Sequence, residues 1–414
     1  MTAEPIRAIC RGCDAELSTV LLDLGDMPLV NEYPPLDSTA DQARYPLKAW
    51  VCDACQLVQV TEIVSPEEIF SDYAYFSSYS ESWLEHSKRF ADWALKEYSL
   101  GPSSLVVEIA SNDGYLLKEF MAAGIPVLGV EPAANIAKLA NEAGIPTQNN
   151  FFGLAVAEDL IDTGHPADLV VANNVIAHVP DLQDFTAGLA TVLKPGGVLS
   201  IEFPHLLNIL EKRQFDTIYH EHFSYLSLHS LEPVLNAKGL EVFDVVQIPT
   251  HGGSLRVLAQ RSDGPLRPAG PGLAEVRAAE KAGGLDRMET YSGYTQAVEG
   301  VLDGVRGFLA RAKDEGKTVV GYGAAAKGTI LLNSAGATPD QVAYVTDLNP
   351  HKQERFLPGT RIPIHSPDKI AETRPDYLLI LVWNLKDEIM SQMAPIREWG
   401  GRFVLPIPQV EVLD

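Results

Sequence analysis

The chain has 414 residues, of which 46% are apolar, and a formal net charge of -23 at pH 7. This size and composition predict two or three globular domains and exclude a largely disordered protein. The acidic charge disfavours nucleic acid polymers and anionic membranes as partners, because both are negatively charged. No apolar run reaches membrane-spanning length and no signal peptide is recognisable, so we expect a cytoplasmic protein.

The cysteines form two Cys-x-x-Cys pairs near the start of the chain, namely Cys10, Cys13, Cys52 and Cys55. This spacing predicts a structural zinc site. Four thiolates complete a tetrahedral site and leave no position for water or substrate, so the metal would stabilise the fold and take no part in the chemistry. Two disulfides or a redox-active pair are the alternatives.

Residues 70–79, FSDYAYFSSY, are dense in aromatic and hydroxyl side chains and precede a helix expected over 81–98. Such a segment is suited to covering a ligand. Tyr73, Tyr75 and Tyr79 are individually as well suited to ordinary packing, because a tyrosine combines a large apolar ring with one polar atom.

Residues 105–117, LVVEIASNDGYLL, predict a buried strand, a tight turn and a helix. A turn of this kind directs backbone N–H groups at a ligand. A dinucleotide fingerprint would place glycines at positions 110, 112 and 114, but Ala110 and Asn112 occupy the first two. The turn therefore favours a nucleotide-like ligand other than NAD, with a chance turn in an ordinary α/β domain as the alternative.

Two following strands also end in polar residues. Residues 127–131 end at Glu131, where a doubly wound fold places a carboxylate on a ribose diol. Residues 168–172 lead into Asn173 and Asn174, with His178 shortly after. Because strands and helices alternate from about 103 to 245, we expect a parallel sheet. The order strand, turn, acid, strand resembles S-adenosylmethionine (SAM) methyltransferases.

The densest group of titratable residues lies in 214–225, QFDTIYHEHFSY, which contains Tyr219, His220, Glu221 and His222. Neighbours in sequence point in different directions, so not all of them can serve one site. Metal binding through His220 and His222 is an alternative to acid–base chemistry. A purely structural role is the alternative for His220.

The last third of the chain repeats the opening theme. A Pro- and Gly-rich segment at 262–272 predicts a linker or exposed loop, and a helical region follows it. Residues 318–332 then predict a strand, a small-residue turn and a helix, with further strands at 344–347 and 377–383. We expect a second nucleotide-type crevice here, served by the cations Lys327, Lys352 and Arg355, for which solvated surface charge is the alternative.

Several motifs together resemble the sugar C-methyltransferases over nearly the whole chain: the paired Cys-x-x-Cys sequences, EIASNDG at 108–114, IYHEHF at 218–223, HGGS at 251–254 and GYGAAAK at 321–327. The resemblance implies an α/β protein with a zinc-binding N-terminal module (1–70), a central SAM-binding Rossmann-like methyltransferase domain (71–250) and a C-terminal nucleotide-sugar-binding Rossmann-like domain (251–414). The chain departs from the family pattern at Ala110, where relatives have Gly, and at His220, where they have Asp.

The resemblance also implies the reaction: methylation at C3 of a nucleotide-linked 4-keto-6-deoxyhexose (a TDP- or GDP-sugar) in branched-chain deoxysugar biosynthesis. A ketone at C4 acidifies the C3 proton, so that a positioned base generates an enolate. The implied catalytic residues are Tyr73, His178, Tyr219, Glu221 and His222, with His222 as the base and Glu221 orienting or assisting it.

The implied ligand contacts fall into two groups. The cofactor-binding residues would be Tyr79, Glu108, Ala110, Asn112, Asp113, Leu116, Glu131, Pro132, Asn150, Asn173 and Asn174. The substrate-binding residues would be Tyr322, Ala324, Lys327, Asn349, Lys352, Gln353 and Trp383, with the sugar reaching across to the central domain.

Two other functions remain open at this stage. An O- or N-methyltransferase acting on a small metabolite would need neither a ketone nor a second nucleotide fold, so the C-terminal crevice favours C-methylation. An inactive zinc-ribbon binding module would not need the acidic and histidine side chains that the chain retains: Glu108, Asp113, Glu131, Glu221 and His222.

Overall fold

The computed structural model describes residues 8–61, 64–70, 78 and 81–414. Tyr73 and Tyr79, both expected near a ligand, therefore lie outside the described residues. The described chain divides into two compact units. Unit 1 comprises described residues of Met1–Ser18, Cys52–Leu206 and Phe223–Met288, and unit 2 comprises Thr19–Val51, Leu207–His222 and Glu289–Asp414. The domain boundaries expected at residues 70 and 250 stay a prediction.

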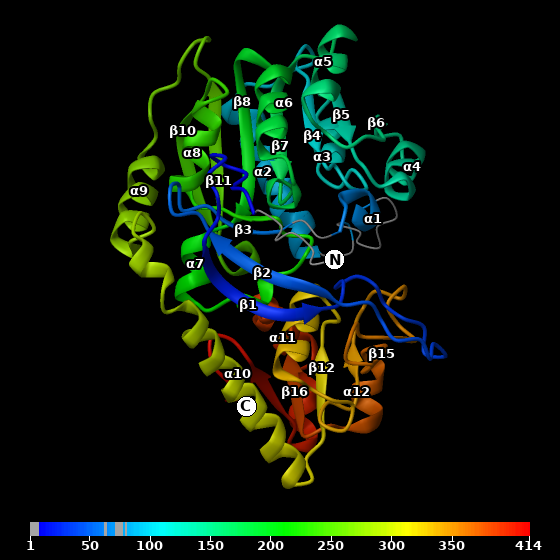
Figure 1. Cartoon of the computed structure of the whole chain (residues 1–414). Helices are drawn as coiled ribbons and strands as arrows, with labels where there is room; N and C mark the ends of the chain where they lie inside the picture. Colours follow the sequence, from blue (N-terminus) through cyan, green and yellow to red (C-terminus); the bar gives the residue numbers. More distant parts are fainter. Residues whose placement is uncertain (1–7, 62–63, 71–77, 79–80) are drawn as a thin grey trace. The chain divides into compact units, whose positions relative to one another are not determined.

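Unit 1 contains a seven-stranded sheet with the strand order β10-β11-β8-β7-β4-β5-β6, seen side by side in Figure 1. Its elements are β3 (Val58–Val60), α1 (Pro66–Phe70), α2 (Glu81–Glu97), β4 (Val106–Ile109), α3 (Leu117–Ala122), β5 (Val127–Val130), α4 (Ala134–Glu142), β6 (Thr147–Gln148), α5 (Leu154–Asp162), β7 (Ala167–Asn173), the 3-10 helix η2 (Ile176–His178), α6 (Leu182–Val192), β8 (Leu193–Pro204), β9 (Ser224–Tyr225), α8 (Leu228–Asn236), β10 (Leu240–Ile248), η4 (Thr250–Gly252), β11 (Ser254–Arg261) and α9 (Pro271–Gly283).

The strand order places a topological switch point beside β4. The chain adds β5 and β6 on one side of β4 and then places β7 on the other side, with β4, β5, β7 and β8 parallel. Strand β11 runs antiparallel to both of its neighbours. In a doubly wound sheet, ligands bind beyond the carboxyl ends of the strands at such a point. The structure thus positions the 110–114 turn for ligand binding.

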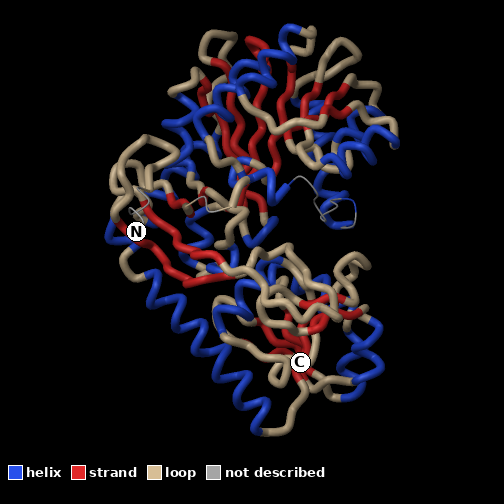
Figure 2. The backbone as a smooth tube through the Cα atoms, turned by 45° about the vertical axis from the view of Figure 1, so that its right-hand side comes forward, coloured by secondary structure: helices blue, strands red, loops and turns tan. Residues whose placement is uncertain are grey.

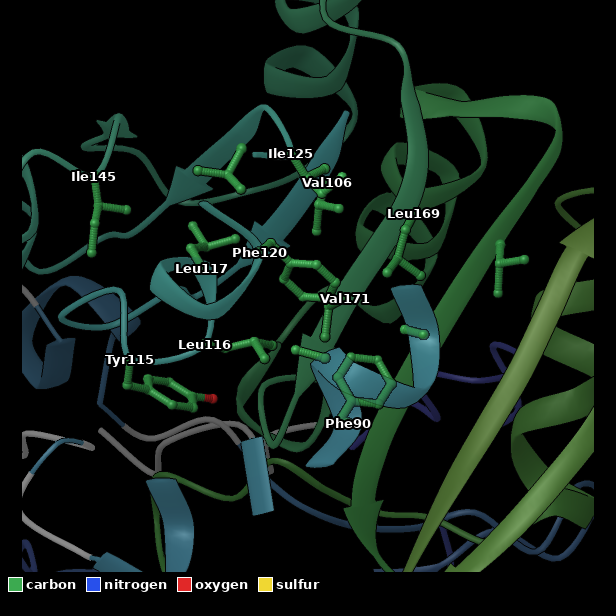
Figure 3. Close-up of a cluster of buried hydrophobic side chains, with 14 of the residues drawn as sticks. Phe90, Val106, Tyr115, Leu116, Leu117, Phe120, Ile125, Ile145, Leu169 and Val171 are labelled. Atoms are coloured by element: carbon green, nitrogen blue, oxygen red, sulfur yellow. The ribbon is translucent and has the colours of Figure 1, made fainter. Parts of the chain in front are cut away.

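The hydrophobic core of unit 1 packs around the elements on both sides of this turn. All four residues of β4 are buried, as expected for a central parallel strand. Leu117 and Phe120, one helical turn apart on α3, are fully buried in the cluster that includes Val106 and Leu169 (Figure 3). Burial of each such side chain contributes about 1.5–3 kcal/mol. The turn between β4 and α3 is therefore held at both ends by packed side chains.

Unit 2 contains a second seven-stranded sheet, with the order β14-β15-β13-β12-β16-β17-β18. Its elements are β1 (Thr19–Met27), β2 (Tyr45–Val51), η3 (Phe215–Thr217), α10 (Tyr294–Asp314), β12 (Val319–Tyr322), α11 (Ala326–Ala335), β13 (Val345–Thr346), β14 (Arg355–Phe356), β15 (Pro363–His365), α12 (Asp368–Thr373), β16 (Tyr377–Ile380), η6 (Trp383–Leu385), α13 (Lys386–Gln392), η7 (Ala394–Trp399), β17 (Arg402–Leu405) and β18 (Glu411–Leu413). Boundaries between the units fall within α7 (Leu206–Glu211) and η5 (Met288–Tyr291).

The second sheet, like the first, has a central strand with a parallel neighbour on each side. Strand β12 lies between β13 and β16, and all three are parallel. The long yellow helix α10 of Figure 1 packs against α11 and β1. Figure 2 shows the strands in red and the bordering helices in blue. The predicted α/β class is confirmed. The strand expected over 377–383 ends at Ile380, and Trp383 begins the 3-10 helix η6.

Within the described part of the chain, the helices include none that is both long and apolar enough to cross a membrane.

Candidate functional site

The four cysteines of unit 1 form one cluster. Their sulfur atoms all lie within 4.8 Å of one another. Each Cys-x-x-Cys turn closes in the same way: the N–H of Asp14 donates to the carbonyl of Cys10, and the N–H of Gln56 donates to the carbonyl of Cys52, both at 2.9 Å. Asp14 and Gln56 both adopt a left-handed conformation, with φ of 61° and 56°. The two turns are therefore copies of one local geometry.

The sulfur spacing fits zinc. Sγ of Cys10 lies 3.5 Å from that of Cys55, and Sγ of Cys13 lies 3.6 Å from that of Cys52. Tetrahedral zinc with Zn–S bonds of about 2.3 Å separates its sulfurs by roughly 3.8 Å, whereas a disulfide needs about 2.05 Å. All four thiols are free. The arrangement fits structural zinc, and the two disulfides considered as an alternative are absent.

The turn after β4 keeps the backbone of a glycine-rich loop without two of its glycines. Ala110, Asn112 and Gly114 all have positive φ, at 53°, 49° and 78°. A left-handed conformation costs a residue with a Cβ about 1–2 kcal/mol, and Asn tolerates it better than Ala. A Cβ on Gly114 would lie 2.3 Å from Cδ1 of Ile145, so the third position admits only glycine without a shift.

Glu131 directly follows β5, its N–H-bound carboxylate contacts this turn, and it is 4% exposed. One carboxylate oxygen accepts from the N–H of Asn112 and the other from the N–H of Ala133, both at 2.9 Å. Burial raises the pKa of Glu131, and the two backbone hydrogen bonds oppose that rise. Asn149 donates to the carbonyls of Glu131 and Pro132, both at 2.8 Å, and so fixes the loop that carries the carboxylate.

Several buried polar atoms at this edge of the sheet make no hydrogen bond with the described residues. They are Ser111 Oγ, Asp113 Oδ1, Asn173 Oδ1, and Asn174 Nδ2 and Oδ1. Burial also raises the pKa of Glu108 well above its ordinary value. Buried polar groups without partners are rare and call for an explanation. A polar ligand such as SAM, which carries hydroxyl, amino and carboxylate groups, fits this set.

The other residues expected around the cofactor differ in exposure. Leu116 is fully buried in the core cluster, and Asn150 is exposed. Pro132 is half-buried, as is His178 at the end of η2. Their contacts with a ligand stay a prediction.

The titratable segment 219–222 belongs to unit 2. Nδ1 of His222 lies 2.9 Å from the carbonyl oxygen of Thr217, and Nε2 lies 2.8 Å from the hydroxyl of Tyr219. Since a carbonyl can only accept, Nδ1 carries the proton of the neutral ring and Nε2 accepts from the phenol. His222 is 8% exposed, so its environment is largely dry. This ring is arranged to take a proton through Nε2.

Glu221 is held by a residue from the insert between the cysteine pairs. Nδ2 of Asn31 lies 2.8 Å and 3.0 Å from the two carboxylate oxygens of Glu221. Glu221 itself is 3% exposed. His220 points elsewhere: its Nε2 lies 3.2 Å from the carbonyl of Tyr45 and 3.3 Å from that of Pro46. Burial lowers the pKa of His220, and its hydrogen bonds to the two backbone carbonyls oppose that shift.

His220 and His222 form no metal site with other ligands in the described chain, where four cysteines are the only group of three or more such residues. This result removes support for the histidine-metal alternative.

The turn after β12 contacts the same insert. The Tyr33 hydroxyl donates to the carbonyl of Ala324 at 2.7 Å, and Nζ of Lys352 donates to that carbonyl at 3.0 Å. Lys352 also lies 3.8 Å from Asp347 and 5.3 Å from the ring centroid of Tyr33. Gln353 donates to the carbonyl of Asp347 at 2.9 Å. The N–H of Asn349 donates to Asp347 at 2.9 Å, so Asn349, Lys352 and Gln353 all contact Asp347, and Lys352 also contacts Ala324.

Lys327 sits in the first turn of α11 and is 9% exposed. Its Nζ lies 4.7 Å from the ring centroid of Trp383 and 3.2 Å from Oδ1 of Asn384. Nε1 of Trp383 donates to Asp216 at 2.7 Å. Burial raises the pKa of Asp216 to about 6, and the positive charge of Lys327 opposes this rise. Burial also lowers the pKa of Lys327, and the carboxylate of Asp216 opposes this decrease. Tyr322 donates to Gln392 at 3.1 Å.

Sequence reasoning missed Asn31, Tyr33, Asn149 and Asp216. Asn149 precedes Asn150, and Asp216 lies within the segment 214–225. Their closeness in sequence to residues already selected was the available signal. Asn31 and Tyr33 lie in the insert between the cysteine pairs, and no local pattern marks them, because their partners are about 190 and 290 positions away.

Family comparisons cover most of the chain. A family model described as "Putative zinc binding domain" matches residues 10–70, one described as "Methyltransferase domain" matches 80–245, and one described as "C-methyltransferase C-terminal domain" matches 249–408.

Individual proteins are also similar to this chain. C-methyltransferase NovU from Streptomyces niveus is 36% identical over 408 residues, 98% of this chain and 96% of that protein. Mitochondrial ubiquinone biosynthesis O-methyltransferase from Homo sapiens is 27% identical over 34% of this chain and 42% of that protein. The solved SAM-bound magnesium protoporphyrin IX methyltransferase of Synechocystis is 16% identical over 43% of this chain and 79% of that chain, with a TM-score of 0.34. The chain belongs to the C-methyltransferase family and is a SAM-dependent C-methyltransferase with a zinc-binding domain.

Proposed function

We propose that the protein methylates C3 of a nucleotide-linked 4-keto-6-deoxyhexose through an enolate. The observation that carries the proposal is the hydrogen bond between Tyr219 and His222. Nε2 of His222 is the acceptor in this bond, and the side chain is largely buried. A carbon next to a ketone becomes a nucleophile only after its proton is removed. Methyl transfer to carbon therefore needs such a base, whereas a substrate with a free amine does not.

The cofactor half of the reaction belongs to the crevice beside β4. SAM, when bound, supplies a methyl group on a positively charged sulfur. Glu131 would hold the ribose hydroxyls, because it directly follows β5 and its carboxylate retains lone pairs beyond the two backbone hydrogen bonds. Asp113, Asn173 and Asn174 have buried polar atoms without a partner among the described residues, and these atoms would bind the remaining polar groups.

The substrate half belongs to the crevice after β12. Its cations, Lys327 and Lys352, suit a nucleotide diphosphate in a chain that is otherwise strongly acidic. Trp383 presents an aromatic face, and Tyr322 presents a hydroxyl. A TDP- or GDP-linked sugar matches this combination of charge and stacking surface, and a nucleic acid polymer does not match the net charge.

The proton transfer follows from the hydrogen bonds of the free protein. When the phenol of Tyr219 turns to the C4 oxygen of the sugar, it stabilises the developing oxyanion and releases Nε2 of His222. His222 then takes the C3 proton, and Glu221, held by Asn31, keeps the segment in place. The enolate carbon would then take the methyl group that bound SAM supplies, S-adenosylhomocysteine would leave, and the proton would pass from His222 to water.

The test is incubation of the protein with methyl-labelled SAM and a panel of TDP- and GDP-linked 4-keto-6-deoxyhexoses. The proposal predicts label on C3, located by NMR of the product. Label on a sugar oxygen or on nitrogen would support an O- or N-methyltransferase instead. The 4-hydroxy sugars are the matched control, because they lack the ketone, and they should receive no methyl group on carbon.

A further inference from the structure

Arg11 lies inside the first zinc turn, between Cys10 and Cys13. Its Nε donates to the carbonyl of Pro180 at 2.9 Å, and its Nη1 lies 2.7 Å from the carbonyl oxygen of Val60 and 3.1 Å from that of Phe223. The guanidinium also lies 5.3 Å from the ring centroid of Phe223. One side chain within the cysteine cluster thus bonds three backbone segments that are far apart in sequence, all within unit 1.

Two of those carbonyls belong to the segments that carry proposed catalytic residues. Phe223 directly follows His222 in the chain, and Pro180 lies two residues after His178. The contact with Phe223 is reinforced, because the N–H of Val60 donates to the same carbonyl at 3.1 Å. Strand β9, which begins after Phe223, packs against η2, which ends at His178.

Hydrogen bonds around the first Cys-x-x-Cys turn hold Arg11 in place. The N–H of Arg11 donates to Oε1 of Gln59 at 3.1 Å, and Nη1 lies 3.2 Å from the same oxygen. Nε2 of Gln183, on α6, donates to the carbonyl of Gly12 at 2.9 Å. A guanidinium holds several acceptors in a fixed planar pattern, which an ammonium does not reproduce. The geometry of the metal turn is therefore passed to Phe223 and Pro180 through one rigid group.

We propose that Arg11 is a positioning residue for catalysis, which transmits the fold of the zinc turn to the segments of His222 and His178. This inference rests on the proposed function, since it assumes that these histidines serve the reaction. The zinc site then has a role beyond folding energy, because it fixes the backbone that directly follows the base in the chain. Arg11 itself makes no contact with the reacting atoms in this account.

The test compares Arg11→Ala and Arg11→Lys with Arg267→Ala as the matched control. Arg267 is also half-buried, bonds the backbone carbonyls of Gly196 and Gly197, and lies over the rings of Tyr98 and Phe243. It is remote from the proposed catalytic segments in sequence. Its removal therefore measures the loss of a similar set of contacts without a catalytic neighbour.

Four quantities are measured: zinc per chain, SAM affinity by calorimetry, kcat and KM for methylation, and the ring nitrogen signals of His222 in ¹⁵N-histidine-labelled protein. For Arg11→Ala we expect zinc and SAM affinity to be retained, and kcat to fall on the order of 100-fold, the loss typical of a misplaced catalytic group. The His222 signals should shift toward mixed tautomers. Arg11→Lys should recover part of kcat, and Arg267→Ala should keep it.

A purely structural role would lower the folded fraction and leave kcat per folded chain unchanged. That result, or His222 nitrogen signals identical in Arg11→Ala and the native protein, would overturn the inference. The nitrogen signals need no sugar substrate. Failure of the native protein to methylate any nucleotide-linked ketone would overturn the proposed function instead, so the two failures are distinguishable.

Discussion

The hydroxyl of Tyr219 lies 2.8 Å from Nε2 of His222, and this hydrogen bond has a definite direction. Nδ1 of the same ring faces the carbonyl oxygen of Thr217 at 2.9 Å, which fixes the proton of the neutral imidazole on Nδ1. Nε2 is therefore the acceptor, and the phenol is the donor. The segment holds His222 ready to accept a proton.

His222→Asn removes that acceptor. We expect the methylation rate to fall by about 10²- to 10⁴-fold, the usual contribution of a general base, with SAM affinity unchanged because the cofactor residues lie elsewhere in the chain. Steady-state kinetics and calorimetry check the two parts. His165→Asn, which changes a histidine outside the segment 219–222, is the control and should keep the native rate. Normal turnover by His222→Asn would move the base role to Glu221 or Tyr219.

Glu131→Gln keeps the shape of the side chain but removes its charge. A charge-assisted hydrogen bond to a ribose hydroxyl contributes roughly 1.5–3 kcal/mol, so the dissociation constant of SAM should rise by about 10- to 100-fold. Calorimetry measures this directly. Glu142→Gln, which changes an exposed carboxylate on α4, should leave the constant as it is. Equal affinity for native protein and Glu131→Gln would place the ribose elsewhere.

Gly114→Ala and Gly124→Ala form a matched pair. Their φ angles are +78° and +76°, but a Cβ on Gly114 would meet Ile145 at 2.3 Å, whereas a Cβ on Gly124 would have no atom within 4 Å. The backbone strain is shared, and overpacking adds about 1–3 kcal/mol at Gly114 alone. Urea unfolding should show that difference. Equal losses of stability would mean that Ile145 moves aside without cost.

Asp216→Asn tests the buried carboxyl beside Lys327 and Trp383. Burial raises the pKa of Asp216 from its ordinary value of 3.8 to about 6. Between these values the folded state binds a proton that the unfolded state has released, so this group's contribution to stability falls as the pH rises. The difference corresponds to about 3 kcal/mol.

Unfolding free energies of the native protein and Asp216→Asn should therefore be compared at pH 4 and at pH 7. The stability advantage of the native protein should be larger at pH 4, because asparagine does not titrate. An advantage that does not change with pH would show that the carboxyl titrates in the same range in both states.

Cys52→Ser removes one thiolate from the cluster of four. Because structural zinc contributes folding energy directly, the variant should lose its metal and most of its soluble yield. Metal analysis of purified, unstripped native protein should give one zinc per chain. A native protein without zinc would contradict the assignment, whatever the behaviour of the variant.

Local patterns were enough to predict the central strands of the two sheets. Short apolar runs such as 105–109 and 318–322, each followed by small turn residues and then helical spacing, predict strand, turn and helix, and β4, α3, β12 and α11 confirm them. The Cys-x-x-Cys spacing likewise predicts the metal cluster, because the ligand set is encoded within each turn.

The remaining parts of the site depend on contacts between distant segments. Asn31 reaches Glu221 only because the insert between the cysteine pairs packs in unit 2, and no periodicity marks either residue of the pair. The apolar run at 377–382 also continues past the end of β16, and Trp383 instead begins a 3-10 helix where its indole meets Asp216. Tertiary contacts decide such positions.

The most direct test of the central claim is exchange of the C3 proton of a nucleotide-linked 4-keto-6-deoxyhexose in deuterated water, followed by NMR. With the demethylated cofactor S-adenosylhomocysteine present, the native protein should remove the C3 proton signal without forming a methylated product, and His222→Asn should leave the signal intact. Exchange by His222→Asn at the native rate would contradict an enolate formed by this histidine. So would a native protein that methylates C3 in the presence of SAM but shows no exchange of the C3 proton with S-adenosylhomocysteine.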